Sequence, residues 1–132
     1  MQANATSRKS ENGFFVSAHL TLLIVFYTRI TMRQYFNANN YPLNFDYYYR
    51  HPRTYSRRGI FSVDEPAPTI RGVNRPKPVD YVQHCKDAAP PTGINSLTTM
   101  QRALLQTFPP EFQFNDCQAT SDQLVGNAVP VN

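Results

Sequence analysis

Eleven prolines in 132 residues, set against five glycines and no tryptophan, limit most strongly what this chain can fold into. Proline fixes φ and removes a backbone donor, so this usage indicates much irregular backbone. Hydrophobic residues make up 41% of the chain and charged residues 17%, which allows a core and argues against a solvated, disordered chain. We expect one small domain, or part of a larger one, with long ordered loops rather than a helical bundle.

Residues 14–27 form an apolar run (FFVSAHLTLLIVFY). The run is shorter than the roughly 20 residues that a membrane span needs. Glu11 and the lack of a small-residue cleavage site argue against a secretory signal. The β-branched and aromatic residues at 22–27 favour a buried strand, with a helix, a membrane or signal segment, or a stretch with no native role as alternatives. We expect His19 to be an ordinary core-edge histidine.

Positive charge is concentrated in the centre of the chain, whose net charge is +4. Asp64 and Glu65 are the only acids in a stretch that holds seven of the 13 Lys and Arg residues: Arg50, Arg53, Arg57, Arg58, Arg71, Arg75 and Lys77. Aromatic residues interleave with cations over residues 35–55. Arginine forks bind phosphate or guanine edges and tyrosine rings stack on bases, so the pattern suits nucleic acid. The alternative is a solvated basic face beside a small aromatic core.

The centre of the chain also predicts two short strands. Residues 60–63 read as the first strand, and Pro66 and Pro68 fix an extended connection. A second strand is expected around residues 69–73, where Gly72 either ends it or lets the backbone approach a phosphate closely.

Two capping signals predict helices near the C-terminal end. Thr98 and Gln101 form a capping box, so a helix should begin there. Its buried face should carry Leu97, Met100, Leu104 and Phe108. The helix should end at the pair Pro109 and Pro110. A second helix should be capped over residues 120–123. Cys85 and Cys117 are not spaced as a metal site or a disulfide framework, so we expect a reducing, cytoplasmic setting and no metal.

Three blocks in order, residues 61–72 (FSVDEPAPTIRG), 97–109 and 126–130, resemble the C-terminal part of the DNA cytosine-5 methyltransferases. In that family they are the target-recognition region with its Thr-aliphatic dipeptide, the ninth motif and the tenth motif. The resemblance implies an α+β fragment of an α/β S-adenosylmethionine-dependent methyltransferase, with an irregular short-strand recognition region followed by two short helices. It divides the chain into an unassigned segment at 1–48, a partial target-recognition region at 49–93 and a truncated C-terminal motif segment at 94–132.

The resemblance also implies site residues. Thr69 would lie near the DNA backbone beside the target cytosine, Ile70 would pack beneath it, and Arg71 would bind a phosphate or a base. The remaining cations would hold phosphates of double-stranded DNA: Arg50, Arg53, Arg57, Arg58, Arg75 and Lys77. Contacts to S-adenosylmethionine, once a catalytic half completes the site, would come from Asn127, Ala128 and Val129.

Several family features are missing from this sequence. The Pro-Cys-Gln nucleophile loop, the Glu-Asn-Val block and the glycine-rich cofactor loop are absent. Residues 116–118 (DCQ) lack the proline and lie on the wrong side of the recognition region, so no catalytic residue is expected here. Asn95 stands where the family usually has an arginine that braces the recognition region, which removes a charged donor.

We therefore expect the recognition and C-terminal segment of a restriction-modification DNA (cytosine-5-)-methyltransferase, inactive alone. It would be either one subunit of a split enzyme, with a separate catalytic subunit as its partner, or the remnant of an interrupted gene. A free-standing DNA-binding module and a small membrane-associated protein are the alternatives.

Overall fold

The structure, a computed structural model, describes residues 29–115 and 117–129. Every helix and strand named below belongs to the unit Thr31–Asn132. The apolar run at 14–27 and its His19 lie outside the described residues. Among the residues that are described, no helix is long and apolar enough to cross a bilayer.

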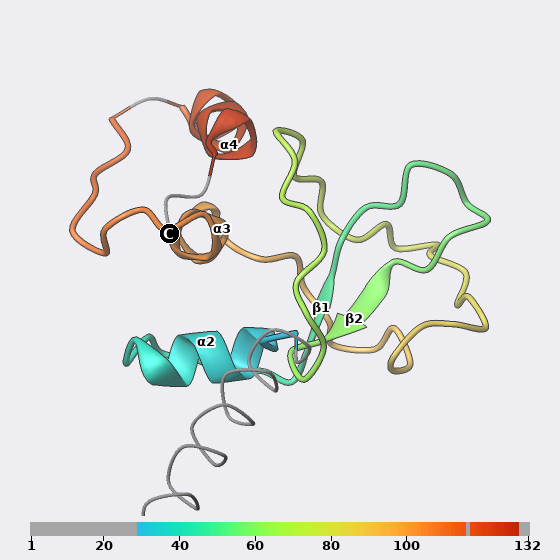
Figure 1. The fold of residues 1–132 in the computed structure, drawn as a ribbon. Helices are drawn as coiled ribbons and strands as arrows, with labels where there is room; N and C mark the ends of the chain where they lie inside the picture. Colours follow the sequence, from blue (N-terminus) through green and yellow to red (C-terminus); the bar gives the residue numbers. More distant parts are fainter. Residues whose placement is uncertain (1–28, 116, 130–132) are drawn as a thin grey trace, which may run out of the picture. The chain divides into compact units, whose positions relative to one another are not determined.

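The described residues form a small α+β arrangement, as the sequence predicts. Its elements are α2 (Met32–Ala38), β1 (Tyr47–Tyr49), β2 (Ile60–Ser62), α3 (Thr99–Leu105) and α4 (Gln118–Asn127). The two strands form an antiparallel hairpin in which Tyr48 lies opposite Phe61, and their rings stack with centroids 5.9 Å apart. Figure 1 shows long irregular segments between β2 and α3, in keeping with the many prolines.

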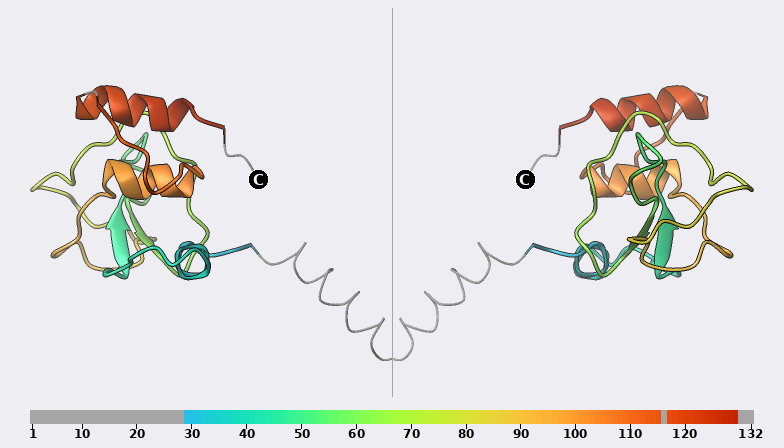
Figure 2. Two further views of the ribbon diagram at one scale, coloured as in Figure 1. Left: turned by 90° about the vertical axis from the view of Figure 1, so that its left-hand side faces the viewer. Right: turned by 90° about the vertical axis from the view of Figure 1, so that its right-hand side faces the viewer.

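One core joins α2, the hairpin and α3. Its buried members are Met32, Phe36, Tyr48, Phe61, Val63, Leu97 and Leu104. The two buried side chains of α2 are four residues apart and so share one face of the helix. The Tyr35 hydroxyl of α2 donates to the Leu104 carbonyl of α3 at 3.0 Å. α4 packs on α3 in turn, as Figure 2 shows from two sides.

Both α2 and α3 begin with a Thr/Gln capping box. The predicted box at Thr98 and Gln101 is confirmed, with both reciprocal hydrogen bonds present. Thr31 and Gln34 form the same box before α2. That helix falls in the stretch that the sequence analysis left unassigned, although Thr-x-x-Gln followed by aromatic residues is the same signal.

The strand expected around residues 69–73 is wrong. This segment runs without ladder partners. Arginine side chains satisfy its carbonyls instead, because Arg50 donates to the Thr69 carbonyl at 2.8 Å and Arg102 donates to the Arg71 carbonyl. Side-chain donors thus take the place of the backbone N–H groups that a neighbouring strand would have supplied.

The C-terminal end of α3 also differs from its prediction. The helix ends at Leu105, ahead of the Pro-Pro pair, and Thr107 adopts φ 64°. The amides of Thr107 and Phe108 donate to the carbonyls of Leu104 and Ala103, each at 3.0 Å, which is the Schellman arrangement. Phe108 therefore leaves the helix face and packs its ring 5.1 Å from that of Phe112.

α4 begins earlier than expected, and the cap predicted over residues 120–123 is wrong. Its N-cap is Cys117, whose side chain makes no capping hydrogen bond. Ser121 and Asp122 are buried inside the helix, where Asp122 bonds to α3. The Asp122 side chain, part of the predicted cap, thus makes a contact with another helix instead.

Asp87 fastens the loop between β2 and α3 to the start of β2. One carboxylate oxygen accepts from the amides of Gly59 and Ile60 at 2.9 and 3.0 Å, and the other accepts from the Tyr81 hydroxyl and the His84 amide, both at 2.8 Å. Burial alone would raise the pKa of Asp87, but the four donors outweigh it and lower the pKa below its usual value. Burial and Asp87 together raise the pKa of Tyr81 to about 12.

Replacing Thr107 with glycine should stabilise the protein. A β-branched residue at positive φ is strained, and glycine is free of that strain, so we expect a gain of about 1 kcal/mol in the free energy of unfolding. Urea denaturation of Thr107→Gly and Thr107→Ala measures it. The glycine variant should be the more stable of the two, and equal stability would contradict the strain argument.

Replacing Asp87 with asparagine should destabilise the protein in a pH-dependent way. An asparagine side chain offers one acceptor oxygen instead of two, so about 1–3 kcal/mol should be lost at neutral pH. Because the folded-state pKa of Asp87 lies below the unfolded value of 3.8, the carboxylate stabilises fully above pH 3.8 and ceases to do so as pH falls through the folded pKa. The difference in urea midpoint between the two proteins should therefore shrink from pH 7 to below pH 4, whereas a constant difference would refute this. The exposed Asp80 serves as the matched Asp→Asn control.

Candidate nucleic-acid interface

A groove of about 600 Å³ gathers most of the predicted DNA-binding residues beside the β1–β2 connection. Six of the eight line it: Arg50, Arg53, Arg57, Arg58, Thr69 and Arg71. His84 and Lys86, on the loop that Asp87 fastens, line it as well, and none of the described residues that line it is acidic. We call it the basic groove. Such a surface attracts polyanions.

The arginines of the basic groove fall into two groups. Arg58 pairs with Glu65 and lies 4.3 Å from the centre of the Phe61 ring. Arg50 and Arg71 each donate one bond to a backbone carbonyl, of Thr69 and His51 respectively. These three side chains hold the groove in shape.

Arg53 and Arg57 form the second group. Both are exposed, and neither side chain has a hydrogen-bond partner in the described part of the chain. All of their donors are therefore available to a ligand.

Positive charge in the groove is only partly compensated. Burial lowers the pKa of Arg50, and the neighbouring Arg71 lowers it further. Burial also lowers the pKa of His51, as do the charges of Arg75 and Arg71. An anion bound here would relieve this repulsion.

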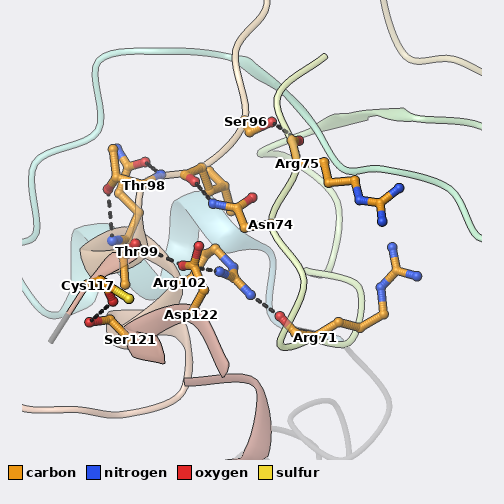
Figure 3. A network of polar contacts seen from close by, with 12 residues as sticks. Arg71, Asn74, Arg75, Ser96, Thr98, Thr99, Arg102, Cys117, Ser121 and Asp122 are labelled. Atoms are coloured by element: carbon orange, nitrogen blue, oxygen red, sulfur yellow. Dashed lines mark hydrogen bonds and ion pairs between the residues drawn. The ribbon is translucent and has the colours of Figure 1, made fainter. Parts of the chain in front are cut away.

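The other predicted DNA contacts occupy distinct places. Thr69 is exposed on the groove wall, whereas Ile70 is half-buried behind it and lines a cavity of about 30 Å³. Arg75 lies outside the groove, and Figure 3 shows its guanidinium facing that of Arg71. Lys77 lines a separate cleft of about 1410 Å³ beside the N-terminal end of α3.

A buried ion pair anchors the segment that carries Thr69 and Arg71. Arg102 of α3 and Asp122 of α4 pair with both side chains only 5% exposed. Thr99 donates to the same carboxylate at 2.8 Å, and Arg102 also donates to the Arg71 carbonyl (Figure 3). Burial lowers the pKa of Arg102, while Asp122 opposes this. One guanidinium thus joins two helices and the groove wall, and we call this set of contacts the arginine clamp.

Arg102 was not among the residues predicted from the sequence. The resemblance implied that the bracing arginine of the family is replaced by Asn95, and in the structure Asn95 contributes its backbone carbonyl to the Tyr49 amide at 2.9 Å. Arg102 lies one turn after Thr98 on a helix whose buried face was predicted to be wholly apolar. The sequence held one signal for this role, since Arg102 is a single arginine on a short helix with an apolar face.

Gly126 lets α4 touch the groove wall. A Cβ atom on Gly126 would strike the Gly72 backbone nitrogen. The atoms nearest to a Cβ on Gly72 belong instead to the flexible Gln123 side chain, at 2.6–2.8 Å. The close approach of the two backbones therefore depends on Gly126.

The predicted cofactor residues lie at the outer end of α4. Asn127 and Ala128 line an open hollow of about 800 Å³ together with Ala119, Thr120, Gln123 and Leu124, and Val129 is 82% exposed. The Asn127 side-chain oxygen accepts from Gln123 at 3.1 Å. None of these lining side chains is charged, so they can form one wall of an S-adenosylmethionine site but offer no ion-pair partner for its ammonium and carboxylate groups.

Two further features bear on chemistry. Cys117, the thiol of the DCQ triplet, is exposed before α4 and contacts Thr120 at 3.3 Å. No group of His, Cys, Asp and Glu side chains among residues 29–115 and 117–129 could hold a metal ion.

Replacing Gly126 with alanine should destabilise the protein. In an ordinary helix this change is favourable by about 1 kcal/mol, but here the methyl group would strike the Gly72 backbone, and overpacking of this kind costs about 1–3 kcal/mol. Urea denaturation of Gly126→Ala and Gly72→Ala gives the comparison. The Gly72 variant should lose much less, because the Gln123 side chain can move. A stabilised Gly126 variant would contradict the close packing of α4 on the groove wall.

Comparison with known proteins places this chain in a family. The family model for C-5 cytosine-specific DNA methylases matches residues 16–132. Type II methyltransferase M.HgiDI of Herpetosiphon aurantiacus is 55% identical over 103 residues, which are 78% of this chain and 32% of that protein. Type II methyltransferase M.HindV of Haemophilus influenzae is 49% identical over 108 residues, covering 78% of this chain and 34% of that protein.

The chain thus spans about a third of the length of these curated relatives. No solved structure matches it.

Proposed function

Because the chain belongs to the C-5 cytosine-specific DNA methylase family, we propose that it supplies the DNA-recognition and C-terminal part of a type II DNA (cytosine-5-)-methyltransferase. By itself it would bind duplex DNA and transfer no methyl group. The basic groove is the observation that carries this proposal, since cations from distant parts of the sequence meet there without a lining acid among the described residues.

In this proposal the groove residues have different roles. Arg53 and Arg57 bind phosphates through donors that have no partner in the described residues. Thr69 and Arg71 present the groove wall beside the target base, and the arginine clamp keeps that wall in place. Arg75 and Lys77 extend the positive surface beyond the groove.

Methyl transfer itself requires residues that this sequence lacks. The reaction needs a thiolate that adds to a flipped cytosine, and S-adenosylmethionine supplies the methyl group when it is bound. Asn127, Ala128 and Val129 would contribute one wall of the cofactor site, and a separate catalytic part would contribute the rest. The outward face of α4, where Leu124 is 42% exposed, is the surface we assign to that contact.

The salt dependence of duplex binding tests the proposal. Each phosphate contact contributes a slope of about −0.9 in a plot of log affinity against log salt concentration. The Arg57→Gln variant should bind more weakly and lower the magnitude of the slope by about 0.9. Fluorescence anisotropy with a labelled duplex at several salt concentrations measures both quantities.

Arg33→Gln is the matched control. It removes the same charge, but Arg33 lies outside the groove and pairs with Asp46 and Asp64 at 2.6 Å each. Its binding slope should equal that of the unchanged chain. Binding that ignores salt, or equal slopes for Arg57→Gln and the unchanged chain, would refute the proposed role of the groove.

A further inference from the structure

Tyr55 is a large aromatic side chain that the fold leaves in solvent. It is 88% exposed, on the connection between β1 and β2. Other tyrosines of this region are packed: Tyr48 and Tyr49 are each 2% exposed. A single exposed apolar residue is common on protein surfaces, so the backbone and the side chains around Tyr55 decide whether it has a role.

A short turn holds the ring in this position. The Arg57 amide donates to the Thr54 carbonyl at 3.1 Å, so residues 54–57 close a hydrogen-bonded turn with Tyr55 as its second residue. The hydroxyls of Thr54 and Ser56 bond at 3.0 Å across the same turn. The ring is therefore presented by an ordered backbone, and only two side-chain torsions must be fixed when it binds.

The surroundings of Tyr55 identify the partner chemically. Arg53, Ser56 and Arg57, close to Tyr55 in the chain, all line the basic groove, so the backbone that carries the exposed ring borders a surface suited to phosphates. A ring beside phosphate-binding cations can reach a sugar, or the face of a base that has left the stack, where stacking contributes about 1–3 kcal/mol per base.

We propose that Tyr55 stacks on a base or sugar face of the bound duplex and supplies a salt-independent part of the affinity. The inference rests on the proposed function, because it takes duplex DNA as the ligand of the groove. Two kinds of contact would then meet at the turn at residues 54–57 and its flanks. The arginines bind the DNA backbone, and Tyr55 packs on the nucleotide between them.

The test measures duplex affinity and salt slope for the full chain and three variants. Tyr55→Ala should weaken binding about tenfold and leave the salt slope unchanged, because stacking releases no counterions. Tyr55→Phe keeps the ring and should bind within about twofold of the unchanged chain. Tyr47→Ala is the matched control, since Tyr47 is 41% exposed on β1 and neither Asp46 nor Tyr48 beside it lines the groove; the affinity of this variant should not change.

The outcomes separate the two proposals. Absence of salt-dependent binding by the unchanged chain overturns the proposed function, and this inference with it. Normal binding by the unchanged chain and equal binding by Tyr55→Ala overturns only the role of Tyr55. Equal losses in Tyr55→Ala and Tyr55→Phe assign the effect to the hydroxyl and overturn stacking. Thermal unfolding of each variant checks that this exposed position does not alter the fold.

Discussion

The Arg102–Asp122 ion pair is the interaction on which the candidate site depends. It is nearly fully buried, so its members are costly to separate, and removal of one partner from such a pair typically costs about 3–5 kcal/mol. The second contact of the guanidinium, to the Arg71 carbonyl, extends that constraint from the helices to an irregular segment that has no ladder of its own. Gly126 completes the attachment by letting α4 lie directly on this segment. A groove made of loops thereby acquires a fixed geometry.

The same residue type serves opposite purposes in this small structure. Arg102 is buried and paired, and it holds the fold together. Arg58 balances its charge against Glu65 at the edge of the groove. Arg53 and Arg57 are exposed and without described hydrogen-bond partners, so their charge is available for a ligand. Counting cations along the sequence gives the sign of the surface, but only the contacts show which cations are structural.

Local signals in the sequence were enough for much of the architecture. The capping box at Thr98 and the strand at residues 60–62 depend on neighbours close in the chain, and both were found. The strand at 69–73 and the cap at 120–123 failed because distant side chains, Arg102 among them, satisfy groups that the local pattern assigned elsewhere. Six of the residues predicted to contact DNA line one groove. Asp87 and Arg102, which position that groove, were not predicted, because their roles depend on contacts with residues distant in the chain.

The measurement that tests the central claim most directly is methylation by a mixture of two chains. This chain would be combined with the first two thirds of a family member that recognises a different DNA sequence, and the methylated sites would be mapped. Methylation only in the mixture, at sites that change with the source of the C-terminal chain, is the result this account predicts. Methylation in the mixture at the sites of the other family member would contradict it, because recognition would then reside outside the basic groove.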